Sequence, residues 1–317
     1  MDNLNNVLDK LEKAINTTTG ANLIRENLSG YIDRLAFKQT PIRDRLMRKV
    51  GSGAAATWRV ATAIGTGNSA FAEGAKPNED DASYAPRSAI YKELGKTKTI
   101  TDKQIAAGAN FIDQEAEQTQ NGMHEIVQDE EVYIINGNAT SAPLQFNGLD
   151  TYIETNIDDD NNDALGFRTE LLDNAVQTLI DNYGVIPTAI YCSFGMKKAI
   201  NQFLNGNQRI DITNSNTPTM GIDIVNYQSV NGKLPIIATT AIANDSTTYT
   251  GNVVGDIYVV TEQSGGQSVL YMEDLYPMSK IPLGRVGAGI SFMITEATVL
   301  VCRAEEMMVK VANVRIS

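Results

Sequence analysis

The sequence is poor in the residue types that catalytic and metal sites use most. One of its 317 residues is a histidine, His124, and two are cysteines, Cys192 and Cys302. A Ser-His-Asp or Cys-His site would have to use His124, whose helical neighbours are glutamines and a glutamate rather than a nucleophile. One histidine cannot build a histidine-based zinc site, and two scattered cysteines do not make a thiolate one. We therefore expect His124 to be a surface or packing residue, and we assign no catalytic, cofactor-binding or metal-binding residue.

Long apolar runs and disulfide patterns are missing as well. Cys192 and Cys302 lie far apart in the apolar runs AIYCSF and VLVCRA, so we interpret them as small buried side chains in a reduced compartment. No stretch of about 18 apolar residues is present, so we expect no membrane-spanning helix. The first residues are acidic and amphipathic and lack the apolar core of a secretion signal. These features predict a cytosolic product without a membrane partner.

Positive charge is in short supply. The 26 Lys and Arg residues are outnumbered by 38 Asp and Glu residues, which gives a net charge of -12. This balance argues against tight binding to a nucleic-acid backbone. One basic cluster contains Lys38, Arg43, Arg45, Arg48 and Lys49. The cluster is either a nucleic-acid patch or an arm that pairs with acidic faces of neighbouring subunits, and the negative net charge favours the arm.

Nucleotide-binding and hydrolase motifs are absent. The sequence contains neither a Walker loop nor a GxSxG motif. Gly284, Gly287 and Gly289 fall in the wrong order for a dinucleotide loop and precede a predicted strand rather than a helix. We interpret these glycines as a bend between two strands.

One acidic run, from Asp158 to Asp163, has partial calcium-loop spacing. Positions 1, 3, 5 and 12 of an EF-hand loop are matched by Asp159, Asn161, Asp163 and Glu170. Ala164 stands where the sharp turn of such a loop needs glycine, and the preceding segment resembles a strand rather than a helix. The favoured interpretation is an acidic loop before a helix N-terminus, where negative charge is stabilising. Whether the run binds calcium stays open.

A long helix is predicted over residues 110–137. Its apolar residues recur mostly three, four or seven positions apart, at Ile112, Ala116, Met123, Ile126, Val127, Ile134 and Ile135. Acidic residues lie between them, including Glu130 and Glu131, and we assign these to the solvent-exposed face. Gly137 is expected to end the helix in the left-handed conformation. The helix would be about 40 Å long, which is typical of a strut with a sheet packed along one side.

The segments before this helix read as an arm followed by a hairpin. Residues 1–16 form an amphipathic helix, and residues 23–50 form a basic arm, interrupted by Pro41, that should lie across something else, such as another subunit. Residues 52–66 read as a strand that contains Trp58, and the acidic tip at residues 73–83 makes a long hairpin. A hairpin of this length cannot bury itself and needs a neighbour.

After the long helix, the pattern alternates helices with strands and then continues with strands only. Helices are predicted over residues 166–183 and 196–204, and strands over residues 189–193, 222–225, 234–238, 256–261, 269–273, 289–295 and 297–302. The order indicates an α+β chain.

Four passages in this order resemble the major capsid proteins of tailed phages, whose shared fold is the Hong Kong 97 capsid fold. They are FAEGAKPNEDDASYAP, the entry, body and exit of the long helix over residues 98–149, LLDNAVQTLIDNYGVIPTAIYCSFGMKKAI, and ITEATVLVCRAEEMMVKV. The resemblance covers about residues 50–317 and depends on order and spacing rather than on one motif. It implies an arm over residues 1–50, an extended loop over 51–100, a peripheral domain with a spine helix over 101–150, an axial domain over 151–265 and return strands of both domains over 266–317.

The resemblance implies a structural protein rather than an enzyme. Copies would form hexamers and pentamers of an icosahedral virion shell that encloses double-stranded DNA and assembles in the bacterial cytoplasm. A portal protein is a further expected partner. Whether decoration proteins bind the shell stays open. Only about 50 residues precede the hairpin, so we expect no extensive processing and a separate scaffold protein. The alternatives are an encapsulin, which encloses enzymes, and, from another class, a secreted β-rich binding module.

Overall fold

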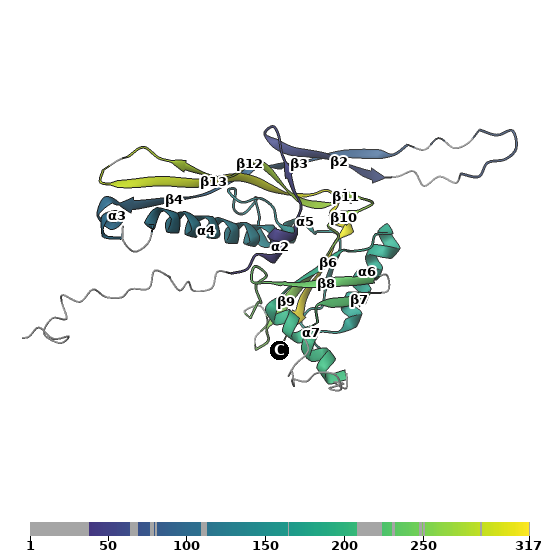
Figure 1. Ribbon diagram of the computed structural model, residues 1–317. Coiled ribbons are helices and arrows are strands. Elements are labelled where there is room, and N and C mark those ends of the chain that lie inside the picture. The colour runs from purple at the N-terminus through teal and green to yellow at the C-terminus, as the bar shows by residue number, and fades with distance from the viewer. Residues whose placement is uncertain are drawn as a thin grey trace, which may run out of the picture.

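The computed structural model describes residues 38–63, 69–76, 79, 81–108, 113–163, 165–207, 224–229, 232–246, 249, 251–285 and 287–316. Two sheets, a long helix and a projecting hairpin make up this part of the chain (Figure 1). The amphipathic helix predicted over residues 1–16 lies outside the described residues. The α+β class predicted from the sequence is confirmed.

The first sheet has four strands and carries the long helix on one face. Its order is β1 (Arg48–Val50), β12 (Leu270–Pro282), β13 (Gly289–Cys302) and β4 (Lys92–Thr101). β1 runs parallel to β12, and the other two pairs are antiparallel. The spine helix α4 (Gln114–Asn136) lies along this sheet and contacts β4 and β13 (Figure 1).

Both ends of α4 have clear physical causes. At the start, the Asp113 carboxylate accepts hydrogen bonds from the backbone N–H groups of Glu115 and Ala116 at 3.0 and 3.2 Å. At the other end, Gly137 follows the last helical residue as predicted. The predicted left-handed conformation is wrong, because φ of Gly137 is -60°. Glycine is needed there for close approach, since a Cβ atom would lie 2.2 Å from the Phe146 carbonyl oxygen.

The predicted apolar stripe of α4 is largely confirmed, with one correction. Ile126, Ile134 and Ile135 are buried, and the half-buried Met123 packs against the same core. Val127 is half-buried and Ala116 is exposed, whereas Ile112 is outside the described residues. The correction concerns two residues assigned to the solvent-exposed face, because Glu130 and Glu131 are buried, with exposed fractions of 0% and 2%.

The projecting hairpin is shorter than predicted. It consists of β2 (Ala55–Ala63) and β3 (Ser83–Ile90), which pair antiparallel with Ala55 opposite Ile90 (Figure 1). The following run, β4, leaves the hairpin and pairs with β13 instead. Tyr91 lies at the break and is buried, with its hydroxyl donating to Glu273 of β12. This anchor separates the hairpin from the four-stranded sheet.

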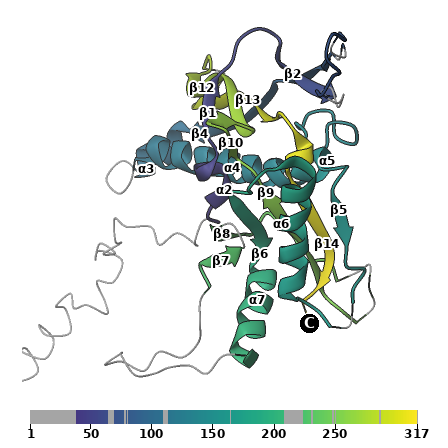
Figure 2. The ribbon, with the colours of Figure 1, turned by 90° about the vertical axis from the view of Figure 1, so that its right-hand side faces the viewer.

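The second sheet has six strands and two helices on one face. Its order is β5 (Ile157–Asp159), β14 (Val309–Arg315), β9 (Val254–Val260), β6 (Ala189–Ser193), β8 (Gly232–Thr239) and β7 (Asn226–Ser229). The helices are α6 (Thr169–Tyr183), which contacts β14 and β9, and α7 (Phe194–Asn207), which contacts β6, β8 and β9 (Figure 2). A strand predicted over residues 222–225 is misplaced, since Ile224 and Val225 precede β7.

The six-stranded sheet joins the two parts of the molecule. Along β6, Ala189 and Tyr191 belong to the core that contains the spine helix, whereas Ile190 and Cys192 belong to the core under α6 and α7. This alternation is the two-residue period of a strand that is buried on both faces. The sheet is therefore a partition between two hydrophobic cores.

Short elements complete the described chain. They are α2 (Pro41–Arg45), α3 (Asp102–Gly108), α5 (Leu149–Tyr152), the hairpin of β10 (Gln263–Ser264) and β11 (Gln267–Ser268), and the 3₁₀ helix η2 (Glu305–Met307). Pro41, which was expected to interrupt the arm, begins α2, because its missing N–H costs nothing at the first helical position. No helix in the described ranges is long and apolar enough to cross a membrane.

We expect Ile134→Ala to destabilise the chain by about 2–5 kcal/mol, because Ile134 is fully buried between the spine and the sheet. Val132→Ala on the exposed side of the same helix is the matched control and should change stability by about 0.5 kcal/mol or less. Urea unfolding of both variants measures the difference. Equal losses would mean that the helix is rotated relative to the arrangement described above.

Candidate functional site

The N-terminal arm segment, residues 38–50, lies on the spine helix of its own chain. Its helix α2 contacts α4 and β8, and its strand β1 pairs with β12. We call the contact between this segment and α4 the arm–spine junction. The prediction was that the arm lies across something else, such as another subunit, and residues 38–50 lie across the spine and a strand of their own chain.

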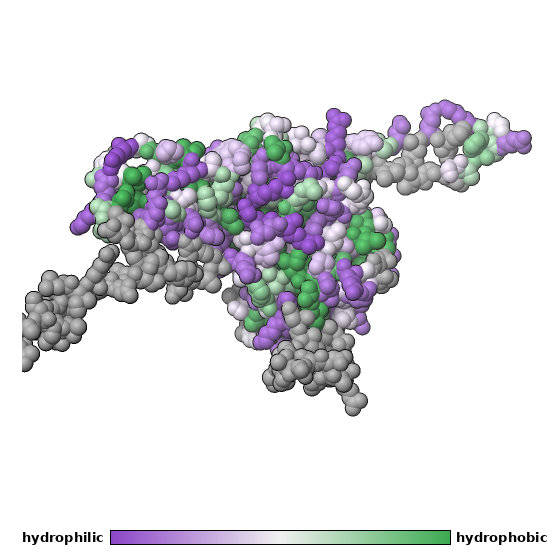
Figure 3. Space-filling view, viewed as in Figure 1, coloured by the Kyte–Doolittle hydropathy of each residue, from purple (hydrophilic) through white to green (hydrophobic). Residues whose placement is uncertain are grey.

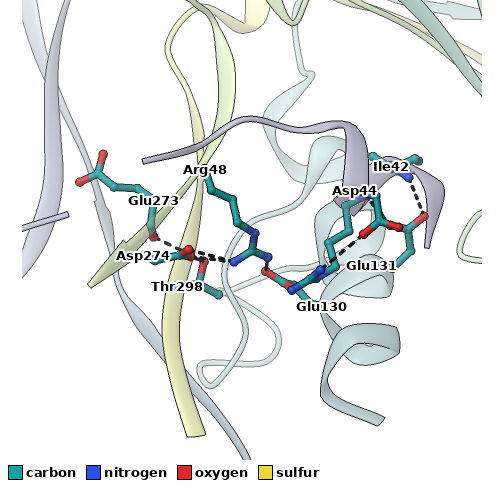
Figure 4. Close-up of polar contacts among 9 residues, drawn as sticks. Ile42, Asp44, Arg48, Glu130, Glu131, Glu273, Asp274 and Thr298 are labelled. Atoms are coloured by element: carbon teal, nitrogen blue, oxygen red, sulfur yellow. Dashed lines mark hydrogen bonds and ion pairs between the residues drawn. The ribbon is translucent and has the colours of Figure 1, made fainter. Parts of the chain in front are cut away.

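Glu131 of α4 caps the arm helix. Thr40 occupies the N-cap position of α2 but makes no side-chain cap. The Glu131 carboxylate instead accepts hydrogen bonds from the backbone N–H groups of Ile42 and Arg43, at 3.3 and 2.7 Å (Figure 4). It also accepts from the Thr239 hydroxyl at 2.9 Å. One carboxylate thus joins the arm, the spine and the six-stranded sheet, and it satisfies helix N–H groups that would otherwise lack acceptors.

Glu130, the next residue of the spine, binds two arginines of the arm. Its carboxylate is buried and accepts from Arg43 Nε and from Arg48 Nη2. Arg48 Nη1 also reaches both carboxylate oxygens of Asp274 on β12, at 3.0 Å each (Figure 4). Asp274 in turn accepts from the Thr298 hydroxyl of β13 at 2.7 Å. Charged hydrogen bonds therefore connect the arm with the spine and with two strands of the first sheet.

Electrostatics explains why these charges can be buried. Burial alone would lower the pKa of Arg48, but Glu130 and Asp274 raise it overall. Burial raises the pKa of Glu131, and its hydrogen bonds from Arg43 and Thr239 counteract that effect. A buried carboxylate without a partner costs several kcal/mol. This cost is avoided in the junction, because Glu130 and Glu131 each accept several hydrogen bonds and Arg43 and Arg48 each have more than one acidic partner.

A third carboxylate, Glu296 of β13, lies beside the junction and is 2% exposed. Its Oε1 atom has no hydrogen-bond partner within the described part of the chain. Burial and the nearby Glu130 raise the pKa of Glu296 to about 7, although Arg48 and Arg43 act in the opposite direction. The Glu296 carboxyl group therefore loses its proton at a higher pH than an ordinary glutamate does.

Four residues of the basic cluster, Arg43, Arg45, Arg48 and Lys49, have partners inside the chain. Besides Arg43 and Arg48, Arg45 binds Glu262, which also accepts from the Tyr191 hydroxyl of β6. The Lys49 ammonium lies 3.8 Å from the ring centroid of Tyr271. The arm thus pairs with acidic residues as predicted, and for Arg43, Arg45 and Arg48 these residues belong to the same chain.

The hairpin of β2 and β3 contrasts with the junction. It extends away from both sheets, and large side chains on it are exposed, including Tyr84 at 68% and Phe71, near its tip, at 58% (Figure 1). Polar and apolar groups alternate along its surface (Figure 3). The tip carries an ion pair between the exposed side chains of Lys76 and Glu79. This element is available for contact with other molecules.

The acidic run proposed for calcium is organised by an arginine. Arg168 donates to Asp160 at 2.7 Å and lies 3.0 Å from Asp163. Asp159 accepts from the side chain of Asn313, and Glu170 begins the first turn of α6. Within the described residues, no group of three or more His, Cys, Asp or Glu side chains is placed to hold a metal ion.

The remaining sequence interpretations fall outside the junction. His124 is half-buried on α4. Cys192 and Cys302 are buried free thiols, and burial raises the pKa of each to about 12. Gly287 has a φ of 85° and lies between β12 and β13, which confirms the bend predicted there.

Sequence reasoning missed the junction although one signal was present. Ile126, Glu130 and Ile134 are spaced by four residues, so Glu130 lies on the apolar stripe itself. A carboxylate at that position predicts a buried partner. The identity of the partner could not be read from the helix, because Arg48 is 82 positions away from Glu130.

Comparison with known proteins identifies a family. The family model described as SU10 major capsid protein matches residues 13–315. No curated protein sequence matches. Among solved structures, the capsid of a native GTA particle has a TM-score of 0.74 at 10% identity, covering 95% of this chain and 100% of that one. The cyanophage A-1(L) capsid has a TM-score of 0.70 at 14% identity, covering 95% and 99%.

An encapsulin is similar too. The SrpI encapsulin of Synechococcus elongatus PCC 7942 has a TM-score of 0.66 at 12% identity, covering 96% of this chain and 97% of that one. At such identities the structures establish the fold alone, which is the Hong Kong 97-like fold predicted from the sequence.

We expect Glu130→Gln to destabilise the chain by about 3–5 kcal/mol, because it leaves two arginines beside one neutral amide. Glu125→Gln is the matched control on the same helix, since Glu125 is half-exposed and its ion pair is a surface contact with Lys98. That surface pair is worth about 1 kcal/mol or less. Denaturant unfolding compares the two, and a loss no greater than that of the control would show that Glu130 is solvated.

Glu296→Gln should stabilise the chain in a pH-dependent way. The folded chain holds the Glu296 proton up to about pH 7, compared with an ordinary value of 4.5, so ionisation of Glu296 lowers stability as pH rises between these values. The variant should raise the Tm by about 2–6 °C at about pH 8.5 and by much less at about pH 5. Differential scanning calorimetry at both values tests this, and an equal effect at both would refute it.

Proposed function

The chain belongs to the SU10 major capsid protein family, and from this premise we propose how it builds a shell. A major capsid protein is a structural protein whose copies associate into the capsid of the virion. We propose that the copies form hexamers and pentamers of an icosahedral shell that encloses double-stranded DNA and assembles in the bacterial cytoplasm. We assign no catalytic role to any residue.

The projecting hairpin is the observation that carries this proposal. Among the described residues, the base of the hairpin packs on the body of the same chain through Ala56, Ala89 and Trp58. Farther out, Phe71 and Tyr84 are exposed. An element with exposed aromatic side chains and few contacts of its own is typical of a surface that another protein covers. A second copy of the chain is the partner that a shell supplies in abundance.

The chain would be divided among the parts of the shell as follows. We propose an arm over residues 1–50, an extended loop over 51–100, a peripheral domain with the spine over 101–150, an axial domain over 151–265 and return strands over 266–317. The pairing of β14 with β9 and of β13 with β4 supports return strands in both sheets. A separate scaffold protein and a portal are further partners that we propose for such a shell.

The encapsulin alternative has one observation in its favour, the similarity to the SrpI encapsulin. The family match over residues 13–315 favours the virus shell. Electron microscopy of the purified full chain, with its scaffold where one exists, tests shell formation. Nuclease-protected DNA inside particles from infected cells supports the virus shell, whereas protein cargo supports the encapsulin. A chain that stays monomeric under all conditions would contradict both.

Deleting residues 73–83 should leave the melting temperature of the monomer within about 2 °C, because the tip contributes nothing to either described core. Particle yield should fall strongly, since the hairpin would lose its reach. The control is the double variant Lys76→Gln and Glu79→Gln, which keeps the length and removes the exposed ion pair. Sedimentation and calorimetry measure yield and stability, and unfolding of the deleted monomer would contradict a peripheral role for the tip.

A further inference from the structure

Glu296 occupies an irregular position of the first sheet. The register of β12 with β13 jumps from Tyr276 opposite Ala297 to Ser279 opposite Thr295, so no β12 residue is paired with Glu296. On its other side, Glu296 is opposite Leu94 of β4. Bulges of this kind redirect side chains. The result is a buried carboxyl group whose Oε1 atom lacks a hydrogen-bond partner among the described residues.

Charged groups approach Glu296 from several packed elements. Glu130 of the spine and Asp274 of β12 are the nearby carboxylates, and Arg48 and Arg43 of the arm are the nearby cations. Burial raises the pKa of Tyr276 of β12, and Glu93 of β4 and Glu296 raise it further. Near the arm helix, Asp44 is exposed, and Glu131 binds the backbone of α2 and Thr239. The two cations that counteract the burial of Glu296, Arg48 and Arg43, both come from the arm.

We propose that the arm–spine junction is a pH-sensitive switch, in which ionised Glu296 strengthens the hold of Arg43 and Arg48 on the spine and protonated Glu296 loosens the arm. While Glu296 is ionised, departure of the arm would leave it facing Glu130 without a cation. Two buried carboxylates at close range repel each other, so departure is opposed. Once Glu296 is neutral, this repulsion no longer opposes departure, and the arginines keep only their direct pairs among the described residues, with Glu130, Asp274 and the exposed Asp44.

The direction of the pH effect follows from linkage. The arginines lower the pKa of Glu296 while the arm is bound, so the pKa of a still-buried Glu296 rises when the arm leaves. Release of the arm is therefore accompanied by proton uptake, and acid favours release. Acid has the opposite effect on global unfolding, which it opposes. The two effects are compatible, because release of the arm leaves Glu296 buried, whereas unfolding exposes it to water.

Hydrogen exchange of the full chain tests the switch. The amides of the arm segment report binding directly, since those of Ile42 and Arg43 donate to Glu131. After correction for the intrinsic pH dependence, protection of residues 41–50 should fall about tenfold from about pH 8.5 to about pH 6, which corresponds to a one-unit difference in the pKa of Glu296 between bound and released states. Glu296→Gln should show the low protection at both pH values.

Two control variants isolate Glu296. His124→Gln removes the single histidine of the chain, and Glu125→Gln removes an exposed carboxylate of the same helix. Both should retain the wild-type pH dependence. The proposal is overturned if wild-type protection does not change with pH, or if the change persists in Glu296→Gln, which would assign it to Glu131. The measurement needs only the folded chain, so its outcome is independent of whether particles form.

Discussion

A buried carboxylate on the spine helix sets the position of the arm. Glu130 lies between the helix and the first sheet with an exposed fraction of 0%, and a charge in such a place requires a cation. Arg43 and Arg48 provide two, and both come from residues that precede the hairpin. If the arm left or shifted along the helix, the buried Glu130 carboxylate would lose Arg43 and Arg48 as its partners. Geometry at one residue therefore determines where residues 38–50 lie.

Buried ion pairs contribute little net stability compared with apolar packing, but breaking one is costly. This asymmetry suits the arm–spine junction, which fixes one position of the arm and which we propose to loosen with pH. The apolar stripe at Ile126, Ile134 and Ile135 holds the spine on its sheet in either case. The charged residues of the junction add specificity on top of that core. Packing and charge thus have separate tasks within one stripe of the helix, where Glu130 lies between Ile126 and Ile134.

Local patterns predicted the regular elements, whereas contacts between distant segments could not be predicted. The buried strand β6 matches its predicted range because five consecutive buried residues read the same in any tertiary context. The end of the hairpin at Ile90 depends on Tyr91 reaching Glu273, a residue 182 positions away. Gly137 was recognised as a helix end, but its cause is a carbonyl group of Phe146 that no helical pattern contains. The arginines of the arm were recognised as an ion-pairing group, but their acidic partners within the same chain, Glu130 and Glu262, could not be named from the sequence.

The junction and the hairpin share one short stretch of β12. Residues 272–274 pair with β1 of the arm, and within them Asp274 binds Arg48 while Glu273 binds Tyr91 at the base of the hairpin. Gly51, directly after β1, packs against Tyr91 at the base of the hairpin, where a Cβ atom would lie 2.3 Å from the Tyr91 hydroxyl. A shift of β1 along β12 would therefore disturb both Asp274 and the Tyr91 anchor. The position of the arm and the base of the hairpin therefore depend on the same two neighbouring residues of β12, Glu273 and Asp274.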